Sequence, residues 1–491
     1  MHVWVEEEVQ TSDFGDERLN ERFKVIMDCF SQKPSLSIPA ACGGWAETMA
    51  AYRFFANERV DAHEVLAPHQ DATLDRMAEQ DVVLLIQDTT EIDVTRREEK
   101  MKGAGPLNDE SRIGFFDHAM LAVTPERVPL GVIEADIWAR DWEEFRENQR
   151  DKKAKKKKQR QKPIEEKESF RWLQGYQRGC EIAEQLSKTT LVVISDSEGD
   201  IFECFAEAQP ETSEKKAQWI TRACQDRNLC NDEESCPWQK LWDEVGSTAV
   251  LGTMEIQVSK NNPKSTDKQK RNQARSARTA TLTIQATRVT LKGPSRPGGK
   301  LDDIQVNAVL VRETNPPAGE EPVEWLLLTS LPINTFAKVC LVIDYYCCRW
   351  QIEVYFRILK SGCKVEDLQL ETAESFKPCL ALYMIVAWRV MYVLMLGREC
   401  PEMPCDLVFS DDEWKAVYAV VEQQPPPTKA PTLQTLVYMI ASLGGHLGRT
   451  SDGPPGPKTM WIGMQRMRDL AWAWHTFGPT KLAAGKPKMR V

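Results

Sequence analysis

Two short and wholly apolar segments constrain the fold of this chain most. Val82–Ile86 and Leu191–Ile194 contain only Val, Leu and Ile, and each is as long as a typical β-strand. A strand with no polar face has to be covered on both sides, which happens in sheets that lie between layers of helices. Asp88 and Asp196 each follow two residues after one of these runs. We therefore expect an α/β fold with both aspartates at strand ends, where sites in such sheets commonly form.

The size and net charge of the chain exclude few classes of fold or function. Its 491 residues are enough for about two to four domains with a large core. A hydrophobic content of 42% and a charged content of 28% are those of an ordinary soluble globular protein. The net charge of −10 does not indicate nucleic-acid binding, although a local basic groove attracts phosphates on an acidic protein too. The function therefore has to be sought in motifs.

A charged segment between Tyr346 and Lys360 is the third constraint. At about 100° per residue, a helix over this segment gathers four polar side chains in a strip about 60° wide. They are Tyr346, Arg349, Glu353 and Lys360, with Trp350 and Arg357 beside the strip. The opposite, core-facing stripe consists of Ile352, Tyr355, Phe356 and Leu359. A salt-bridged face exposed to solvent is the alternative interpretation of one acid among several cations.

The remaining segments predict how the chain is organised. Residues 1–65 contain amphipathic helices and no strand-like run. Alternating apolar and polar residues between 247 and 330 indicate antiparallel strands, and helices follow in the rest of the chain. The apolar stretch 376–396 is long enough to cross a membrane, but Lys377 and Arg389 within it favour a buried helix.

Three carboxylates suggest metal-dependent phosphate chemistry. Either aspartate alone is most simply explained as a turn residue. Asp88 and Asp196 together with Glu353 make an oxygen-rich set that suits Mg²⁺ or Mn²⁺. Two such cations about 3.5–4 Å apart activate an attacking oxygen and stabilise the leaving one in phosphodiester chemistry. The chain has six histidines and none falls in these motifs, which disfavours a histidine nuclease or a protease triad.

The spacing of the charged segment carries a family resemblance. Tyr346-(2)-Arg349-(3)-Glu353-(6)-Lys360 reproduces the Y-R-E-K signature and resembles the insertion-sequence-four family of DDE transposases. Three further motifs occur in the order that the family shows. They are Asp88-Thr-Thr, Asp196-Ser-Glu-Gly-Asp and Glu324-Trp-Leu-Leu-Leu-Thr-Ser.

The resemblance implies a fold and a domain order. The fold would be α/β, with an RNase H-like catalytic core made of a mixed sheet flanked by helices. This core would span residues 71–375 and carry a β-rich insertion at about 225–330. A helical DNA-binding domain would occupy residues 1–70, and a helical dimerisation domain residues 376–491.

The resemblance also implies a reaction. Asp88, Asp196 and Glu353 would be catalytic and would hold two Mg²⁺ ions, for which Mn²⁺ could substitute. The enzyme would bind the terminal inverted repeats of its element as a homodimer in a synaptic complex, and would nick each end to free a 3′-hydroxyl. That hydroxyl would form a hairpin with the opposite strand, water would reopen the hairpin, and the freed end would attack target DNA. Such a protein would work in the bacterial cytoplasm, on the nucleoid, and not in a membrane.

Several side chains would contact DNA by the same analogy. Tyr346, Arg349 and Lys360 would hold phosphates, while Trp325 would hold a base flipped out of the bent end with help from Trp350. Without the resemblance, the apolar strand around Trp325 would favour a core role for it. The other predicted contacts with DNA are Arg357, Arg18, Arg22 and Arg53.

Two other functions fit part of this pattern. An RNase H-like nuclease would cleave without joining, but Trp325 and the long insertion argue against it because simple cleavage needs no hairpin. A DNA-binding regulator derived from a transposase is the second alternative, and the presence of all three acids argues against that. A basic run at 152–162 departs from the family pattern, and it fits either a solvated loop or a DNA contact.

Overall fold

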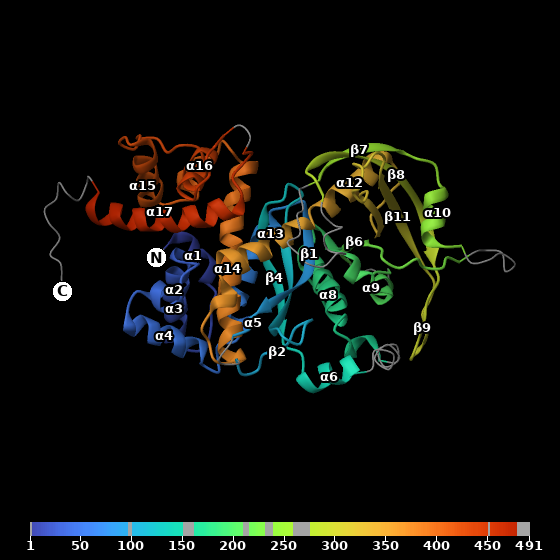
Figure 1. The fold of residues 1–491 in the computed structure, drawn as a ribbon, viewed down its shortest axis with the longest axis horizontal. Helices are drawn as coiled ribbons and strands as arrows, with labels where there is room; N and C mark the ends of the chain where they lie inside the picture. Colours follow the sequence, from blue (N-terminus) through green and yellow to red (C-terminus); the bar gives the residue numbers. More distant parts are fainter. Residues whose placement is uncertain are drawn as a thin grey trace. The chain divides into compact units, whose positions relative to one another are not determined.

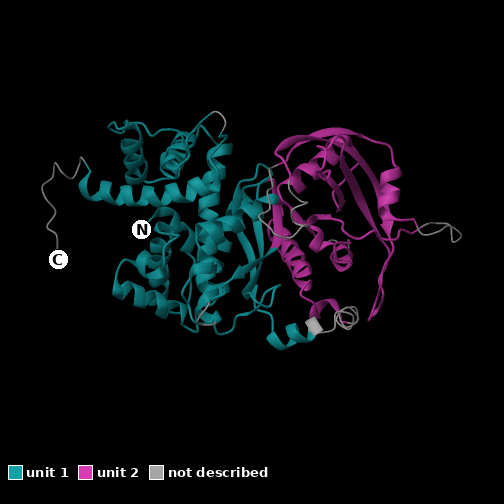
Figure 2. Cartoon of the chain, viewed as in Figure 1, with its two compact units in different colours: residues 1–80, 89–147, 350–491 teal, residues 81–88, 148–349 magenta. Residues whose placement is uncertain are grey.

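The chain forms two compact units, each assembled from separate stretches of sequence (Figure 2). Unit 1 comprises residues 1–80, 89–147 and 350–491, and unit 2 comprises residues 81–88 and 148–349. The division into three domains stays a prediction. A computed structural model of the chain describes residues 2–96, 101–150, 162–209, 216–230, 239–258, 275–449 and 452–478. Nearly all of the basic run at 152–162 lies outside these residues.

Unit 2 is built on a mixed sheet that begins with the first residues of β1 (Val82–Asp93). The parallel part continues through β5 (Thr190–Ser195) and β6 (Gln218–Arg222). An antiparallel part follows, whose strands in spatial order are β12 (Glu324–Thr329), β11 (Ile304–Glu313), β8 (Arg278–Leu291) and β7 (Gly252–Val258) (Figure 1). A separate two-stranded hairpin joins β9 (Ser295–Arg296) to β10 (Gly299–Lys300).

Helices cover the sheet of unit 2, as its apolar strands require. α8 (Phe170–Gln185) packs on β5, and it approaches so closely that a Cβ on Gly179 would lie 2.7 Å from Val193 Cγ2. α10 (Leu241–Ser247) packs against β8 and β11. The other helical segments of this unit are η1 (Ile164–Glu166), η2 (Ser197–Gly199), α9 (Phe202–Glu207) and α12 (Phe336–Cys347). The predicted α/β class, with a mixed sheet flanked by helices, is confirmed.

Unit 1 combines a small sheet with many helices. Its strands are the remainder of β1, β2 (Gly105–Pro106), β3 (Ile113–Val123) and β4 (Pro129–Trp138). Its first helices are α1 (Val3–Val9), α2 (Glu17–Gln32), α3 (Ile38–Cys42), α4 (Trp45–Phe55), α5 (Ala62–Ala78) and α6 (Trp142–Arg150). The later ones are α13 (Trp350–Arg357), η3 (Ile358–Gly362), η4 (Val365–Asp367), α14 (Ala373–Glu399), η5 (Cys405–Leu407), α15 (Asp411–Glu422), α16 (Leu433–Leu443) and α17 (Pro457–Phe477).

α14 is the central helix of unit 1. It packs against α5, β4 and the C-terminal helices, and Trp388 Nε1 donates to Pro129 O at 2.8 Å. Its most apolar window is long enough to cross a membrane, yet 94% of that window is buried within the protein. A helix that is apolar all round and enclosed on all sides serves as the core of a helical layer. The prediction that the apolar stretch 376–396 forms a buried helix is therefore confirmed.

The prediction of one continuous helix over Tyr346–Lys360 is wrong. α12 ends at Cys347 and α13 begins at Trp350, and the amides of Cys348 and Arg349 bond to carbonyls three residues back instead of four. Lys360 then lies in a π-helical turn, Ile358–Gly362. The apolar stripe nevertheless forms as expected, because its four members are all buried, namely Ile352, Tyr355, Phe356 and Leu359.

Candidate catalytic site

The register of two parallel strands places Asp88 and Asp196 side by side. Ile86 pairs with Ile194 in the ladder between β1 and β5. Asp88 lies two residues further along β1, and Asp196 is the residue that follows the end of β5. Neighbouring strands in a sheet lie about 4.8 Å apart, so two residues at one level can share a ligand. Both aspartates are partly exposed. Asp196 follows the end of β5, as predicted, whereas the strand-end position predicted for Asp88 is wrong, because β1 continues through polar residues to Asp93 and is also hydrogen-bonded to β3.

A third parallel strand brings an arginine to the same level. Ser195 pairs with Thr221 in the ladder between β5 and β6, and Arg222 is the next residue of β6. Its Nη2 lies 4.0 Å from Asp196 Oδ2 and donates to Ser197 Oγ at 3.1 Å. Arg222 is not among the site residues predicted from the sequence. Its strand is a mixed run of polar and apolar residues, unlike the wholly apolar runs before Asp88 and Asp196.

Asp88 also lies beside a guanidinium, that of Arg349. Arg349 Nη1 lies 3.2 Å from Asp88 Oδ2, and both side chains are largely buried, with 10% and 15% of their surface exposed. Two carboxylates at neighbouring strand ends repel each other, and a cation beside each one offsets that repulsion. Arg349 and Arg222 supply these cations in unit 2.

Residues around Asp196 hold the end of β5 in place. Asp196 caps η2 by accepting from Glu198 N at 2.8 Å. Gly199 leaves no room for a side chain, because a Cβ there would lie 2.4 Å from Ser195 Oγ. Asp200 is buried and accepts from the backbone amides of Cys224 and Gln225 at 2.9 Å each. Asp200 therefore fixes the loop after Arg222, which is a structural role.

Tyr346 and Trp325 lie together in unit 2. Their rings are 5.3 Å apart and nearly perpendicular, which is a favourable edge-to-face contact. Tyr346 is buried, and burial raises the pKa of its phenol although the nearby Arg222 and Arg349 act to lower it. The phenol is thus neutral at physiological pH and able to donate a hydrogen bond. Trp325 is partly exposed, so it is not simply a core residue.

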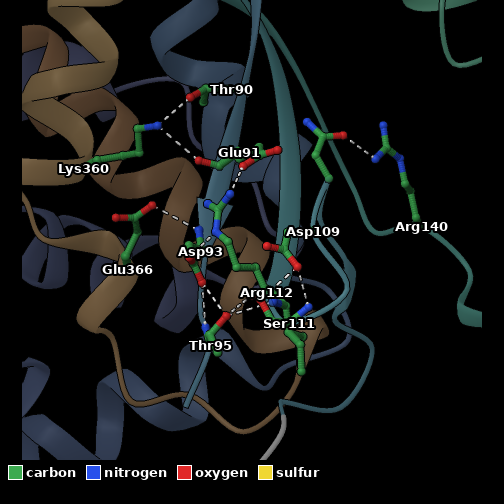
Figure 3. A network of polar contacts seen from close by, with 12 residues as sticks. Thr90, Glu91, Asp93, Thr95, Asp109, Ser111, Arg112, Arg140, Lys360 and Glu366 are labelled. Atoms are coloured by element: carbon green, nitrogen blue, oxygen red, sulfur yellow. Dashed lines mark hydrogen bonds and ion pairs between the residues drawn. The ribbon is translucent and has the colours of Figure 1, made fainter. Parts of the chain in front are cut away.

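Lys360 belongs to a polar network in unit 1 (Figure 3). Its Nζ donates to Thr90 Oγ1 at 2.7 Å and to Glu91 O at 3.2 Å. Both acceptors lie on β1, two and three residues after Asp88. Arg112 pairs with Glu91 and with Asp93 of the same strand. The π-helical turn, a feature that is frequent at functional sites, presents Lys360 to this strand.

The three acids are divided between the two units. Asp88 and Asp196 belong to unit 2, whereas Glu353 lies on α13 in unit 1, four residues after Arg349 in the sequence. Trp350 and Arg357 are on the same helix, and Trp350 is 46% exposed. Within the part of the chain that the structure describes, no group of three or more His, Cys, Asp or Glu side chains is arranged to hold a metal ion.

The chemistry of the two adjacent carboxylates fits a hard divalent cation. Asp88 and Asp196 offer charged oxygen ligands at one sheet edge, and Mg²⁺ in proteins is bound by one or two carboxylates together with waters and substrate phosphates. The two arginines beside them would have to give up these contacts when a cation binds. The two carboxylates are therefore of the chemical type that binds the divalent metal implied by the family resemblance.

The three N-terminal arginines lie on two helices of unit 1. Arg18 and Arg22 are on α2, and Arg53 is on the last turn of α4. Arg18 is exposed and bonds through Nε and Nη2 to Asp16, the residue that caps α2. Arg53 is also exposed, and Arg22 is partly so. Their distribution is compatible with contact with a phosphate backbone, and it also fits ordinary helix surfaces.

Three family profiles of transposases match successive parts of the chain. Residues 1–60 match a family profile described as Transposase DNA-binding, residues 138–388 match Transposase DDE domain, and residues 385–472 match Transposase Tn5 dimerisation domain. A solved structure, described as a piggyBac transposase synaptic complex with hairpin DNA, is similar at 10% identity and a TM-score of 0.33. That similarity covers 99% of this chain and 79% of the other. A TM-score this low establishes no shared fold, and the sequence profiles carry the comparison.

Proposed function

Because this chain belongs to the DDE transposase family, we propose that it moves an insertion sequence by cut-and-paste transposition. As a DDE transposase it is a metal-dependent enzyme that cuts DNA and transfers strands, on a core of RNase H-like fold. It binds DNA and forms dimers, since its two ends match a DNA-binding and a dimerisation profile. The proposed substrates are the terminal inverted repeats of the element and a target DNA. The single observation that carries the proposal is the placement of Asp88 beside Asp196, which lies within the stretch that matches the DDE profile.

The proposed catalytic residues are Asp88, Asp196 and Glu353, which would hold two Mg²⁺ ions. Mn²⁺ would substitute, because it accepts the same oxygen ligands. When bound, such a pair of cations supplies activation of the attacking oxygen and charge stabilisation of the leaving one. The carboxylates would hold such cations in place beside the reacting phosphate. One site can then serve successive steps, because nicking, hairpin formation, hairpin opening and strand transfer are all in-line displacements at phosphorus that differ in the nucleophile.

The proposed phosphate contacts are Tyr346, Arg349 and Lys360. Arg349 has a planar fork that matches a phosphate as well as it matches the carboxylate of Asp88. We infer that its guanidinium exchanges Asp88 for a DNA phosphate when a cation takes over that carboxylate. The neutral phenol of Tyr346 donates to the same backbone, and Lys360 adds a point charge. Arg357 and the N-terminal Arg18, Arg22 and Arg53 are proposed as further backbone contacts.

Trp325 is the proposed holder of a flipped base in the hairpin. Bending a strand back on itself is easier when one base leaves the stack, and an aromatic face can receive it. The ring of Trp325 is partly exposed and is steadied by Tyr346. Trp350, which is 46% exposed, is proposed to assist. The protein would do this work in the bacterial cytoplasm, on nucleoid DNA.

Purified protein, DNA ending in the inverted repeats that flank the gene, and Mg²⁺ together test this function. We expect excised fragments with hairpin ends on a denaturing gel, followed by open ends and joining to a target plasmid. Glu353→Ala should bind the same DNA in a mobility-shift assay and cut none of it. Cleavage without hairpins at any time point would indicate the simple nuclease instead, and binding without cleavage by the unaltered protein would indicate a regulator. Undiminished cleavage by Glu353→Ala would contradict the site assignment.

Trp325→Ala separates nicking from hairpin formation. Nicking needs no flipped base, so we expect it to continue near the wild-type rate. Hairpin formation should fall by about tenfold or more, because stacking of a base on an aromatic ring contributes about 1–3 kcal/mol. Gels of reactions stopped at short times give both rates. Trp325→Phe, which keeps an aromatic face, is the matched control and should recover most hairpin formation. An equal loss of both steps would favour a structural role for Trp325.

A further inference from the structure

Unit 1 contains a cavity of about 370 Å³, none of whose lining residues belongs to the catalytic motifs. Its walls come from α1, α5, α14 and the segment that leads into α15. The cavity is thus shared by the N-terminal stretch that matches a DNA-binding profile and the C-terminal stretch that matches a dimerisation profile. A volume of this size can hold a small organic molecule.

Arg389 is the unusual residue in the cavity wall. Its side chain lies within the apolar helix α14, and the residue is 8% exposed. Nη2 donates to Val408 O at 2.9 Å, whereas Nε has no hydrogen-bond partner among the described residues. No carboxylate in the described part of the chain lies within ion-pair distance of its guanidinium. Burial, followed by the nearby charge of Arg468, lowers the pKa of Arg389 to about 10. A buried cation without a counter-ion costs free energy that a bound anion would recover.

The buried acids around the cavity already have partners. Glu8 accepts from Arg76 Nη1 at 2.6 Å and lies 2.5 Å from His69 Nδ1. His69 Nε2 accepts from the backbone amide of Val132, so Nδ1 carries the proton that Glu8 receives. Glu413 is bonded to the backbone amide of Ser410 and lies 3.3 Å from Arg468 Nε. Both acids act to raise the pKa of Arg389, but each is engaged by another cation and neither forms an ion pair with its guanidinium.

A second unsatisfied donor lies in the same cavity wall. Trp4 belongs to α1 and lines the cavity, and its Nε1 has no hydrogen-bond partner within the described residues. The guanidinium of Arg389 lies 5.2 Å from the Trp4 ring and 5.7 Å from the Tyr392 ring. Trp388 adds a third aromatic wall. Two orphaned donors from separate helices, set among flat apolar rings, define the chemistry of a ligand.

We propose that this cavity binds a small organic acid with one carboxylate and a flat, apolar body. The carboxylate would accept hydrogen bonds from the guanidinium of Arg389, and the body would lie among Trp4, Trp388 and Tyr392. A single charge fits best, because exposed Glu7 and Asp406 also line the cavity and would repel a dianion such as a phosphate ester. The bound acid would tie α1 to α14, and so would stabilise unit 1 where the DNA-binding and dimerisation segments meet.

A pair of probes that differ in charge alone tests this proposal on the full-length protein. Indole-3-acetate carries the carboxylate, and indole-3-acetamide is its neutral counterpart of the same shape. We expect calorimetric titration to give at least about tenfold tighter binding of the acid, the usual difference between a charged and a neutral acceptor at a buried arginine. Saturation with the acid, but not with the amide, should raise the melting temperature.

Three variants show whether the acid binds in this cavity. Arg389→Met removes the cation and should erase the preference for the acid. Arg398→Met alters another arginine of α14 that does not line the cavity, and should bind the acid like the wild type. Leu407→Asp places a negative charge at an exposed lining residue without disturbing the core. It should weaken binding of the acid more than binding of the amide. Equal binding of acid and amide, or undiminished acid binding in both Arg389→Met and Leu407→Asp, would overturn the proposal.

Discussion

At the scale of single residues, the charge of the candidate site is set by three side chains on β1, at the end of β5 and at the end of β6. Asp88, Asp196 and Arg222 occupy one level of three neighbouring parallel strands. Arg222 Nη2 lies 4.0 Å from Asp196 Oδ2, and Arg222 acts to lower the pKa of the Tyr346 phenol. A guanidinium so placed can also stabilise the negative charge that develops on a phosphate in the transition state.

Arg222→Gln should therefore slow cleavage without unfolding the protein. Loss of one preorganised donor at a reacting oxyanion typically costs about 100-fold in rate, and we expect a loss of that order in the excision assay. Arg227→Gln is the contrasting control, because Arg227 is paired with the buried carboxylate of Asp200. That substitution should lower the melting temperature more than Arg222→Gln does. Normal cleavage by Arg222→Gln would show that its guanidinium has no part in the reaction.

The same three residues show how far sequence reasoning reaches. Asp196 could be placed at a strand end because it follows a run with no polar residue. The same pattern located the strand before Asp88 but not its end, because β1 continues through polar residues to Asp93. Arg222 follows a mixed run, Trp219-Ile-Thr, which does not reveal that β6 is a parallel neighbour of β5. Strand order depends on contacts between distant segments, so the level of Arg222 could not be predicted.

At the scale of elements, the packing of α8 on β5 offers a test of the sheet that carries Asp196. Alanine normally stabilises a helix interior relative to glycine by about 1 kcal/mol. At Gly179 the added Cβ would meet the buried, β-branched Val193 at 2.7 Å, and overpacking of this kind costs about 1–3 kcal/mol. We expect Gly179→Ala to lower the free energy of unfolding, measured by urea titration.

Gly298→Ala is the matched control for Gly179→Ala. Gly298 lies in the β9–β10 hairpin, and among the described residues a Cβ there would have no neighbour within 4 Å. The control should leave stability unchanged or slightly raised, since alanine narrows the unfolded ensemble. A gain in stability from Gly179→Ala would mean that α8 can move away from β5 without cost.

The segment between Tyr346 and Lys360 shows what periodicity can and cannot predict. The apolar stripe was predictable, because its spacing depends on a few successive residues and persists through a local break. The interruption at Cys348 and Arg349 and the π-helical turn were not, because no proline or glycine precedes them in the segment. The break turns Arg349 toward Asp88 in unit 2, a contact that no helical wheel contains.

At the scale of the whole molecule, dimer formation gives the C-terminal helices a function. α17 leaves Trp472 69% exposed, within the stretch that matches the dimerisation profile. Exposed tryptophans on such surfaces often contribute 2 kcal/mol or more to binding. Trp472→Glu should therefore weaken dimerisation by about 30-fold or more, measured by analytical ultracentrifugation, and should reduce cleavage in proportion. Val250→Glu, which alters an exposed residue of unit 2, should leave dimer affinity and cleavage unchanged. Normal dimer affinity in Trp472→Glu would show that this face of α17 is not part of the dimer interface.

The stability of the molecule should also depend on one buried carboxyl group of β3. Asp117 is 0% exposed, and among the described residues neither of its oxygens has a hydrogen-bond partner. Burial, with a smaller contribution from Asp136, raises the pKa of Asp117 to about 7, although Lys360 acts in the opposite direction. The usual pKa of an aspartate in an unfolded chain is about 3.9. Between these two values the folded protein keeps a proton that the unfolded chain has released.

That difference gives the pH dependence a definite sign. A folded state that binds the extra proton is favoured at low pH, so the contribution of Asp117 to stability declines as pH rises from about 4 to about 7. Asp117→Asn cannot ionise, and it should raise the free energy of unfolding at pH 8 by an amount on the order of 1–4 kcal/mol while changing it little at pH 4. Urea titrations across this range measure the effect, with Asp75→Asn, exposed on α5, as a control expected to follow the wild type. Parallel curves for Asp117→Asn and the wild type would mean that Asp117 finds a charged or hydrogen-bonded environment in solution.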